Sequence, residues 1–177
     1  MNFNRPVDLK SLREYDGEDW LNSEMEAQLI AEIWQAFSEV PRPSGDLLMS
    51  RQGYGEEGDI DGSLHGKDAR SIPVGDIVYA ADGLYNLTDA ALHHYLPAFM
   101  VAGLLRRDYS ILAKYTIPSV LSPFSILYET ATFEKRFCNY SEKQRRAIRD
   151  YLTFVSLECE DQRSFICDAI AAYWDYD

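Results

Sequence analysis

The stretch SEMEAQLIAEIWQAFSEV, residues 23–40, establishes the fold class of this chain. Apolar residues recur every four positions from Met25 to Phe37, a spacing that places their side chains on one face of an α-helix. Ser23 and Glu26 have the spacing of a capping box, in which the two side chains bond free backbone N–H groups of the first turn. The stretch therefore predicts an amphipathic helix that packs one face against a core.

Three further stretches continue the helical pattern toward the C-terminus. Thr88 and Asp89 cap a second helix that runs through Tyr95, and Pro97 either kinks this helix or starts the next one. Residues 98–105 are strongly apolar and expected to be central to the core, and a second capping-box spacing opens the stretch 141–155. A last helix is predicted over residues 160–174. Two prolines divide the apolar run between these stretches into short pieces, because proline cannot donate to the preceding turn. The pattern predicts an all-α fold of about five to seven helices.

Two segments depart from this pattern. Residues 44–86 contain repeated glycines between polar residues and are expected to form a short helix with irregular connections. Residues 1–22 form an acidic N-terminal segment that is expected to pack loosely. The length of 177 residues suits one domain, so residues 1–177 are predicted to form a single compact helical domain. Six large apolar residues are expected to share its core: Trp34, Phe37, Leu96, Phe99, Leu152 and Ile166.

The formal charge of −12 is the strongest global property of the chain. Residues 1–104 contain 18 acidic and 7 basic residues, whereas the rest contains 11 and 10. Binding to nucleic acid or to an anionic membrane is not expected, because phosphate contact requires clustered Lys and Arg. A basic protein is the expected partner, since a negative field attracts it. With no apolar run long enough for a membrane span or a signal peptide, the expected location is the cytoplasm.

The three cysteines are Cys138, Cys159 and Cys167, and they contain no C-x-x-C pair. On one continuous helix the Cα atoms of the last two would lie about 12 Å apart, which is too far for a disulfide. We expect buried, unreactive thiols at all three positions.

Motifs for cofactors and metals are incomplete. Residues 53–58 spell G-x-G-x-x-G, but the residues that follow do not resemble a helix start, and two glutamates would repel a pyrophosphate. Asp59 and Asp61 begin a calcium-loop spacing, but Leu64 and Arg70 replace its required glycine and its bidentate carboxylate. No cofactor and no bound metal are therefore expected.

Two adjacent histidines, His93 and His94, diverge by about 100° on a helix and cannot share a metal ion. One of the two is expected to be buried and hydrogen-bonded, and the other to face solvent. No catalytic motif is found, so no catalytic residue is predicted, although dispersed residues around His93, His94 and Tyr95 remain an alternative pocket.

Candidate partner-binding residues come from two places. The first is an acidic run in a segment expected to be an exposed glycine-rich loop, with an aromatic residue just before it. The second is the aromatic C-terminal end, since aromatic residues among acids suit an anchor patch for a basic partner. The predicted residues are Tyr54, Glu56, Glu57, Asp59, Asp61 and Trp174.

Three stretches of the chain resemble a family of uncharacterised bacterial proteins. They are residues 36–43, which contain Ala36-Phe37 and VPRP, residues 87–100 (LTDAALHHYLPAFM) and residues 141–154 (SEKQRRAIRDYLTF). The resemblance extends over residues 28–156 and implies a bacterial origin and a small helical domain. It brings no known activity, so no functional residue is transferred from it.

Two functions are consistent with these observations. The first is an immunity or antitoxin-like protein that binds a basic toxin, for example a nuclease, and blocks its nucleic-acid groove. The second is an enzyme or small-molecule-binding protein with a pocket near His93, His94 and Tyr95. The sequence favours the first, because it contains a strong charge asymmetry and no catalytic motif.

Overall fold

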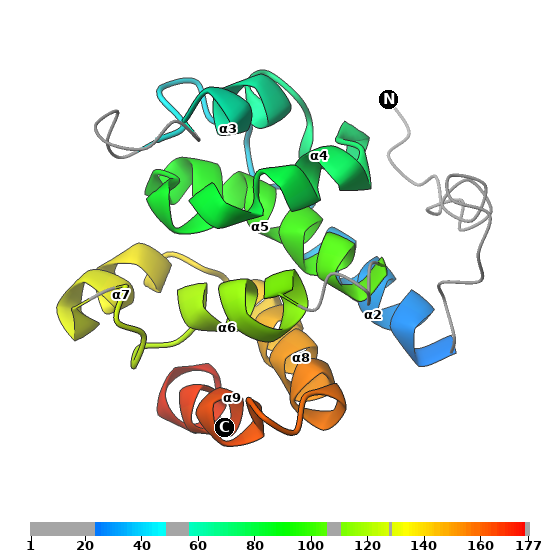
Figure 1. The fold of residues 1–177 in the computed structure, drawn as a ribbon, viewed down its shortest axis with the longest axis vertical. Helices are drawn as coiled ribbons and strands as arrows, with labels where there is room; N and C mark the ends of the chain where they lie inside the picture. Colours follow the sequence, from blue (N-terminus) through cyan, green and yellow to red (C-terminus); the bar gives the residue numbers. More distant parts are fainter. Residues whose placement is uncertain (1–23, 49–56, 106–110, 128, 176–177) are drawn as a thin grey trace.

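The computed structural model describes residues 24–48, 57–105, 111–127 and 129–175, with residues 57–59 and 61 described by their backbone alone. In these ranges the ordered elements are helices, apart from one isolated antiparallel bridge between Leu48 and Leu87. The prediction of a single all-α domain is confirmed (Figure 1). The N-terminal segment 1–22 lies outside the described residues.

Helix α5 (Asp89–Leu105) crosses the middle of the molecule, with other helices on both sides (Figure 1). Fourteen of its seventeen residues are buried, because after Asp89 it has no charged residue and is apolar on every face. Pro97 lies inside this helix and does not end it. The carbonyl group of His93 therefore lacks its usual donor four residues later.

Helices α2 (Glu24–Ala36) and α8 (Glu142–Glu158) pack against each other, and α2 also packs against α5. The predicted capping box of α8 is confirmed: the Ser141 hydroxyl accepts from the Gln144 amide, and the Gln144 side chain accepts from the Ser141 amide. The buried face of α2 differs from the prediction at its start. Met25 is 63% exposed, so the apolar stripe begins at Leu29.

Between α5 and α8 the chain forms the π-helix η3 (Leu112–Thr116), which continues into the short α6 (Ile117–Val120). Helix α7 (Thr130–Phe137) follows a turn-rich connection that contains Pro123. The chain then ends with α9 (Arg163–Ala169), which continues into the π-helix η4 (Ile170–Trp174) against α8. The predicted break at Pro123 is found, but Pro118 lies inside α6 and does not interrupt the helical stretch 111–120. The predicted last helix is confirmed.

Residues 44–86 were predicted to form a short helix with irregular connections. Their described part contains a layer of short helices, which lies on the side of α5 opposite to α7 and α9 (Figure 1). These are α3 (Glu57–Leu64), η1 (Ala69–Ser71), α4 (Val74–Tyr79) and η2 (Ala81–Asn86). Helix α4 contacts α3 and α5, so it links the peripheral α3 to the centre (Figure 1).

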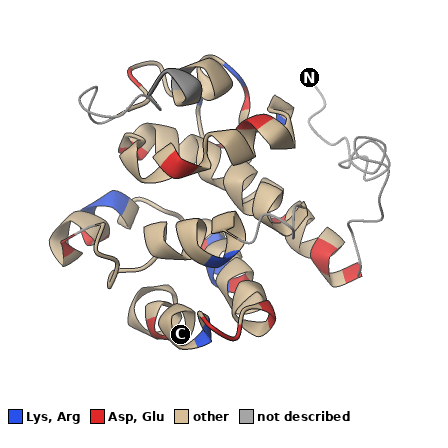
Figure 2. Ribbon diagram, in the orientation of Figure 1, with Lys and Arg blue, Asp and Glu red and all other residues tan. Residues whose placement is uncertain are grey.

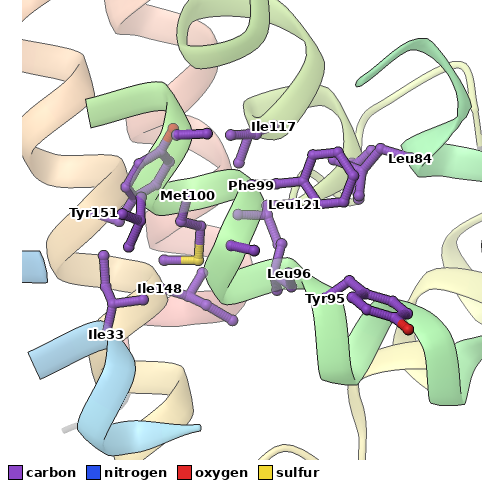
Figure 3. Close-up of a cluster of buried hydrophobic side chains, with 14 of the residues drawn as sticks. Ile33, Leu84, Tyr95, Leu96, Phe99, Met100, Ile117, Leu121, Ile148 and Tyr151 are labelled. Carbon is purple, nitrogen blue, oxygen red and sulfur yellow. The ribbon is translucent and has the colours of Figure 1, made fainter. Parts of the chain in front are cut away.

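The helices enclose one continuous hydrophobic core (Figure 3). Figure 3 shows Met100 of α5 next to Ile33 of α2 and Ile148 and Tyr151 of α8, whereas Phe99 of α5 lies on the other side, next to Leu84. All six residues predicted to share the core belong to it. None of the helices in the described ranges combines the length and the apolar content needed to cross a membrane.

The cysteine prediction is correct for one residue only. Cys159 is buried, whereas Cys138 and Cys167 are exposed. The sequence suggested burial because apolar residues flank the other two, but Cys138 follows the end of α7, and Cys167 lies on the outer face of α9. Apolar neighbours in the sequence therefore did not predict whether each thiol is buried or exposed.

Candidate functional site

The acidic segment was predicted to be an exposed glycine-rich loop. Its described part forms helix α3, so the prediction of a loop is wrong. Ile60 and Leu64 lie four positions apart and are buried, and their packing outweighs the low helix propensity of Gly58 and Gly62. Glu57, Asp59 and Asp61 belong to this helix. Two other predicted partner-binding residues, Tyr54 and Glu56, lie outside the described residues.

This helix also corrects one reason for dismissing the G-x-G-x-x-G pattern. The residues that follow that pattern are helical, since α3 already begins within it, at Glu57, and runs to Leu64. A dinucleotide-binding fold additionally requires a parallel β-sheet next to this turn. In the described part of the chain there is no such sheet.

Gly83 in η2 makes room for α3. A Cβ atom at this position would lie 1.6 Å from Cδ1 of Ile60, far inside van der Waals contact. The absence of a side chain at Gly83 therefore allows Ile60 to pack against η2. This contact holds α3 against the rest of the domain.

Charge is distributed unevenly over the fold: Asp and Glu occur throughout, whereas most Lys and Arg lie on α7, α8 and α9 (Figure 2). The described residues up to Leu105 contain twelve acidic and three basic residues, whereas those from Ile111 onward contain nine and eight. We call the first group, residues 24–48 and 57–105, the acidic half. The charge asymmetry of the sequence is thus an asymmetry between two parts of the folded domain.

The three basic residues of the acidic half hold its elements together. Arg42 donates to the carbonyl oxygen of Gly66 at 2.7 Å, and Lys67 lies 3.2 Å from the Asp76 carboxylate. Arg70 donates to the carbonyl oxygen of Trp34 at 2.7 Å and its guanidinium lies over the indole ring. The two arginines bind backbone carbonyl oxygens and so connect separate segments of the acidic half. With twelve acidic and three basic residues, the acidic half remains strongly negative.

Trp174 was predicted to contact a partner, and the structure contradicts this. The side chain is 1% exposed, and its Nε1 donates to the carbonyl oxygen of Leu121 at 2.7 Å. The indole packs edge-on against Phe133, Phe137 and Tyr173. The sequence placed Trp174 at the end of the last helix and outside its apolar stripe, but the π-helix η4 turns it into the core.

The alternative pocket was expected near His93, His94 and Tyr95, and all three side chains instead join helices. His93 stacks on Tyr140 with ring centroids 4.3 Å apart, and its Nε2 lies 3.0 Å from Oε1 of Gln144. That oxygen also accepts from the backbone N–H of Ser141, which can only donate. The Gln144 atom that faces His93 is thus the side-chain oxygen, which can only accept. His93 therefore carries its proton on Nε2 and donates to it.

His94 and Tyr95 connect α5 to the loops before α4. Nδ1 of His94 lies 3.3 Å from the carbonyl oxygen of Val40, so this nitrogen is the donor. The Tyr95 hydroxyl donates to the carbonyl oxygen of Leu64 at 2.7 Å. The expectation that one histidine is buried is confirmed for His94, while His93 is half-buried. These contacts indicate a structural role for the histidine pair.

These histidines predict a stability that falls as the pH falls. Burial lowers the pKa of both His93 and His94 below 6.5. The unfolded chain therefore binds more protons below about pH 6.5, and each histidine reduces the free energy of unfolding by up to about 1.4 kcal/mol per pH unit. We expect His93→Gln and His94→Asn, which keep a donor, to flatten the dependence between pH 7 and 5.5. Urea unfolding at several pH values tests this, and equal slopes in wild type and variants would contradict it.

Comparison with known proteins gives one match. A family model described as "Family of unknown function (DUF6714)" matches residues 25–177. No curated protein and no solved structure matches the chain. The matched region begins in α2 and contains every helix described above.

Proposed function

The chain belongs to the DUF6714 family, whose function is unknown, and from its charge distribution we propose that it is an immunity-type binding protein of the cytoplasm. Its partner is a basic protein, such as a nuclease toxin domain. The acidic half binds that partner and covers the basic surface that the toxin uses to hold nucleic acid.

The observation that carries this proposal is the ratio of twelve acids to three bases in the acidic half. Such a charge excess raises the rate at which a basic protein meets this side of the molecule. The bases of this half are engaged by Gly66, Trp34 and Asp76. A negatively charged inhibitor also imitates the phosphate backbone that a nuclease binds.

Helix α3 supports the placement of the partner on the acidic half. It is peripheral and bears Glu57, Asp59 and Asp61, with Glu56 immediately before it. A helix held by Ile60 and Leu64 presents a fixed backbone, which reduces the entropy lost on binding compared with a free loop. Trp174 is not part of this proposed surface.

We expect charge reversal on α3 to slow association. A variant with Glu56, Glu57, Asp59 and Asp61 all replaced by Lys changes the net charge by eight units. Each exposed pair contributes about 0.2–1 kcal/mol, so the loss is roughly 2–5 kcal/mol, mostly as a slower association rate. The matched control changes the net charge by the same amount outside the acidic half. It replaces four exposed acidic residues by Lys: Glu134, Glu160, Asp168 and Asp175.

The probe for this test is the product of the gene immediately upstream, measured by surface plasmon resonance at two salt concentrations. We expect the wild-type association rate to fall as salt rises, because exposed charges are screened. The α3 variant should lose most of that salt dependence and the control variant little. Equal rates for the two variants, or no complex with the upstream product, would contradict the proposal.

A further inference from the structure

The connection between α6 and α7 presents three large apolar side chains to solvent. Phe124 is 59% exposed, Ile126 is 102% exposed and Leu127 is 39% exposed. Figure 1 shows this connection at the periphery of the fold. We call these three residues the exposed apolar patch. Single apolar residues are common on protein surfaces, but three large ones within four positions mark an interaction site.

Two serines of the same connection are buried, so the usual distribution of polar and apolar residues is reversed. Ser122 and Ser125 lie inside, next to the exposed Phe124, Ile126 and Leu127. The Ser122 hydroxyl accepts from the backbone N–H of Phe124, and the Ser125 hydroxyl accepts from the backbone N–H of Leu127, both at 3.2 Å. These bonds stabilise a backbone that turns the small residues inward and the large apolar residues outward. Such departures from the folding rules are expected at functional sites.

The connection is also fixed to the core at its beginning. The carbonyl oxygen of Leu121 accepts from Nε1 of Trp174 at 2.7 Å, and both Leu121 and Pro123 are buried. The backbone N–H of Ser125 donates to the carbonyl oxygen of Ser122 at 3.2 Å. A turn that is held in this way loses little conformational entropy when a partner covers it. The exposed apolar patch is therefore preorganised for binding.

The charge distribution indicates which partner covers this patch. Residues 115–128 contain no Asp, Glu, Lys or Arg, and the described residues from Ile111 onward contain nine acidic and eight basic residues. A second copy of the chain can therefore approach the patch with little repulsion, whereas two acidic halves repel each other. A basic protein, in contrast, is attracted to the acidic half and not to this uncharged surface.

We propose that a second copy of this chain covers the exposed apolar patch, so that Phe124, Ile126 and Leu127 of two copies pack together around a twofold axis. A twofold contact uses the same surface on both copies, and an apolar patch is complementary to itself. Three side chains provide less than the about 800 Å² per partner of a standard interface, so the dimer forms only at high protein concentration. The patch lies outside the acidic half, so this dimer does not depend on the proposed toxin complex.

Sedimentation equilibrium of the full chain tests the dimer, with chain concentrations up to about 1 mM. We expect a species of twice the chain mass of 20.3 kDa, whose fraction rises with concentration. It should also rise with salt, because salt screens the repulsion between two acidic copies and favours apolar burial. The proposed toxin complex has the opposite salt dependence, so the two results are distinguishable. A chain that stays monomeric at the highest concentration, or a dimer that weakens as salt rises, would overturn the proposal.

Two variants place the contact on the patch. Phe124→Asp combined with Ile126→Asp should lower the association constant at least about thirtyfold, because charges enter the centre of the interface in both copies. The matched control is Ile111→Asp combined with Leu157→Asp, which adds the same charge at two other exposed apolar residues and should leave association unchanged. All four residues are exposed, so both variants should fold as the wild type does. A dimer that survives the patch variant, or is lost equally in both variants, would overturn the proposal.

NMR and lipid vesicles distinguish the second copy from other occupants. In ¹H–¹⁵N spectra of the wild type, the amide resonances of residues 124–127 should shift with concentration and those of α2 should not. Cosedimentation with neutral phosphatidylcholine vesicles is not expected. A monomeric chain that binds these vesicles through Phe124 and Ile126 would assign the patch to a lipid surface and overturn the proposal.

Discussion

Replacement of Trp174 by alanine is expected to lower the free energy of unfolding by about 3–5 kcal/mol, the range for large aromatic residues removed from a core. The indole is buried against three aromatic rings, and its loss would leave a cavity between α7 and η4. It would also leave the carbonyl oxygen of Leu121 without its donor. Urea unfolding followed by far-ultraviolet circular dichroism measures this change.

Two further variants make the Trp174 result specific. Trp174→Phe keeps most of the packing and loses the hydrogen bond, so its expected loss is smaller, about 1–3 kcal/mol. Phe124→Ala removes an aromatic side chain that is exposed and should change stability by less than about 1 kcal/mol. If Trp174→Ala kept full stability and only weakened partner binding, the sequence-based assignment to a partner surface would be restored.

Replacement of Arg136 by methionine is expected to lower the free energy of unfolding by about 2–4 kcal/mol. Its buried guanidinium donates to the carbonyl oxygens of Tyr85 and Leu87 and lies 3.4 Å from the Asp89 carboxylate. Without it, two carbonyls at the C-terminal end of η2 lose their donor, and each such loss typically amounts to about 1–3 kcal/mol. The ion pair adds less, because the Asp89 side chain is 59% exposed.

The neighbouring Lys135 provides the matched control for Arg136. It lies on the same helix and is exposed, so Lys135→Met should change stability by less than about 0.5 kcal/mol. Arg136→Lys keeps the charge but loses the planar fork and should fall between the two. Equal losses for Lys135→Met and Arg136→Met, again from urea unfolding, would show that the buried contacts to Tyr85 and Leu87 contribute nothing.

Local patterns were sufficient to predict the longer helices. The capping box of α8 depends on Ser141 and Gln144, three residues apart, and forms as expected. Residues 98–105 were predicted to be central because they are strongly apolar, and they are buried; the sequence left open whether Pro97 starts a new helix, and α5 continues through it. In these helices the propensity, the cap and the buried face agree, so the sequence alone determines the outcome.

Tertiary packing decided the parts that the sequence did not predict. Helix α3 forms despite Gly58 and Gly62 because Ile60 packs into the space left by Gly83, more than twenty residues later. The close packing of Gly103 in α5 against Ala113 in η3 and Tyr151 in α8 brings together three separate segments, and no local spacing indicates that. Trp174 lies outside the apolar stripe of the predicted last helix, and the wider turn of η4 brings it into the core.

The pairing of α2 with α8 has a consequence for synthesis on the ribosome. The apolar stripe of α2 is complete once Phe37 has emerged, but α8 begins only at Glu142, more than a hundred residues later. At a usual rate of about 5–20 residues per second, α2 waits roughly 5–20 seconds for its partner. Its other main packing partner, α5, is complete only at Leu105, so the nascent chain exposes Ile33 and its neighbours to chaperones until α8 has emerged.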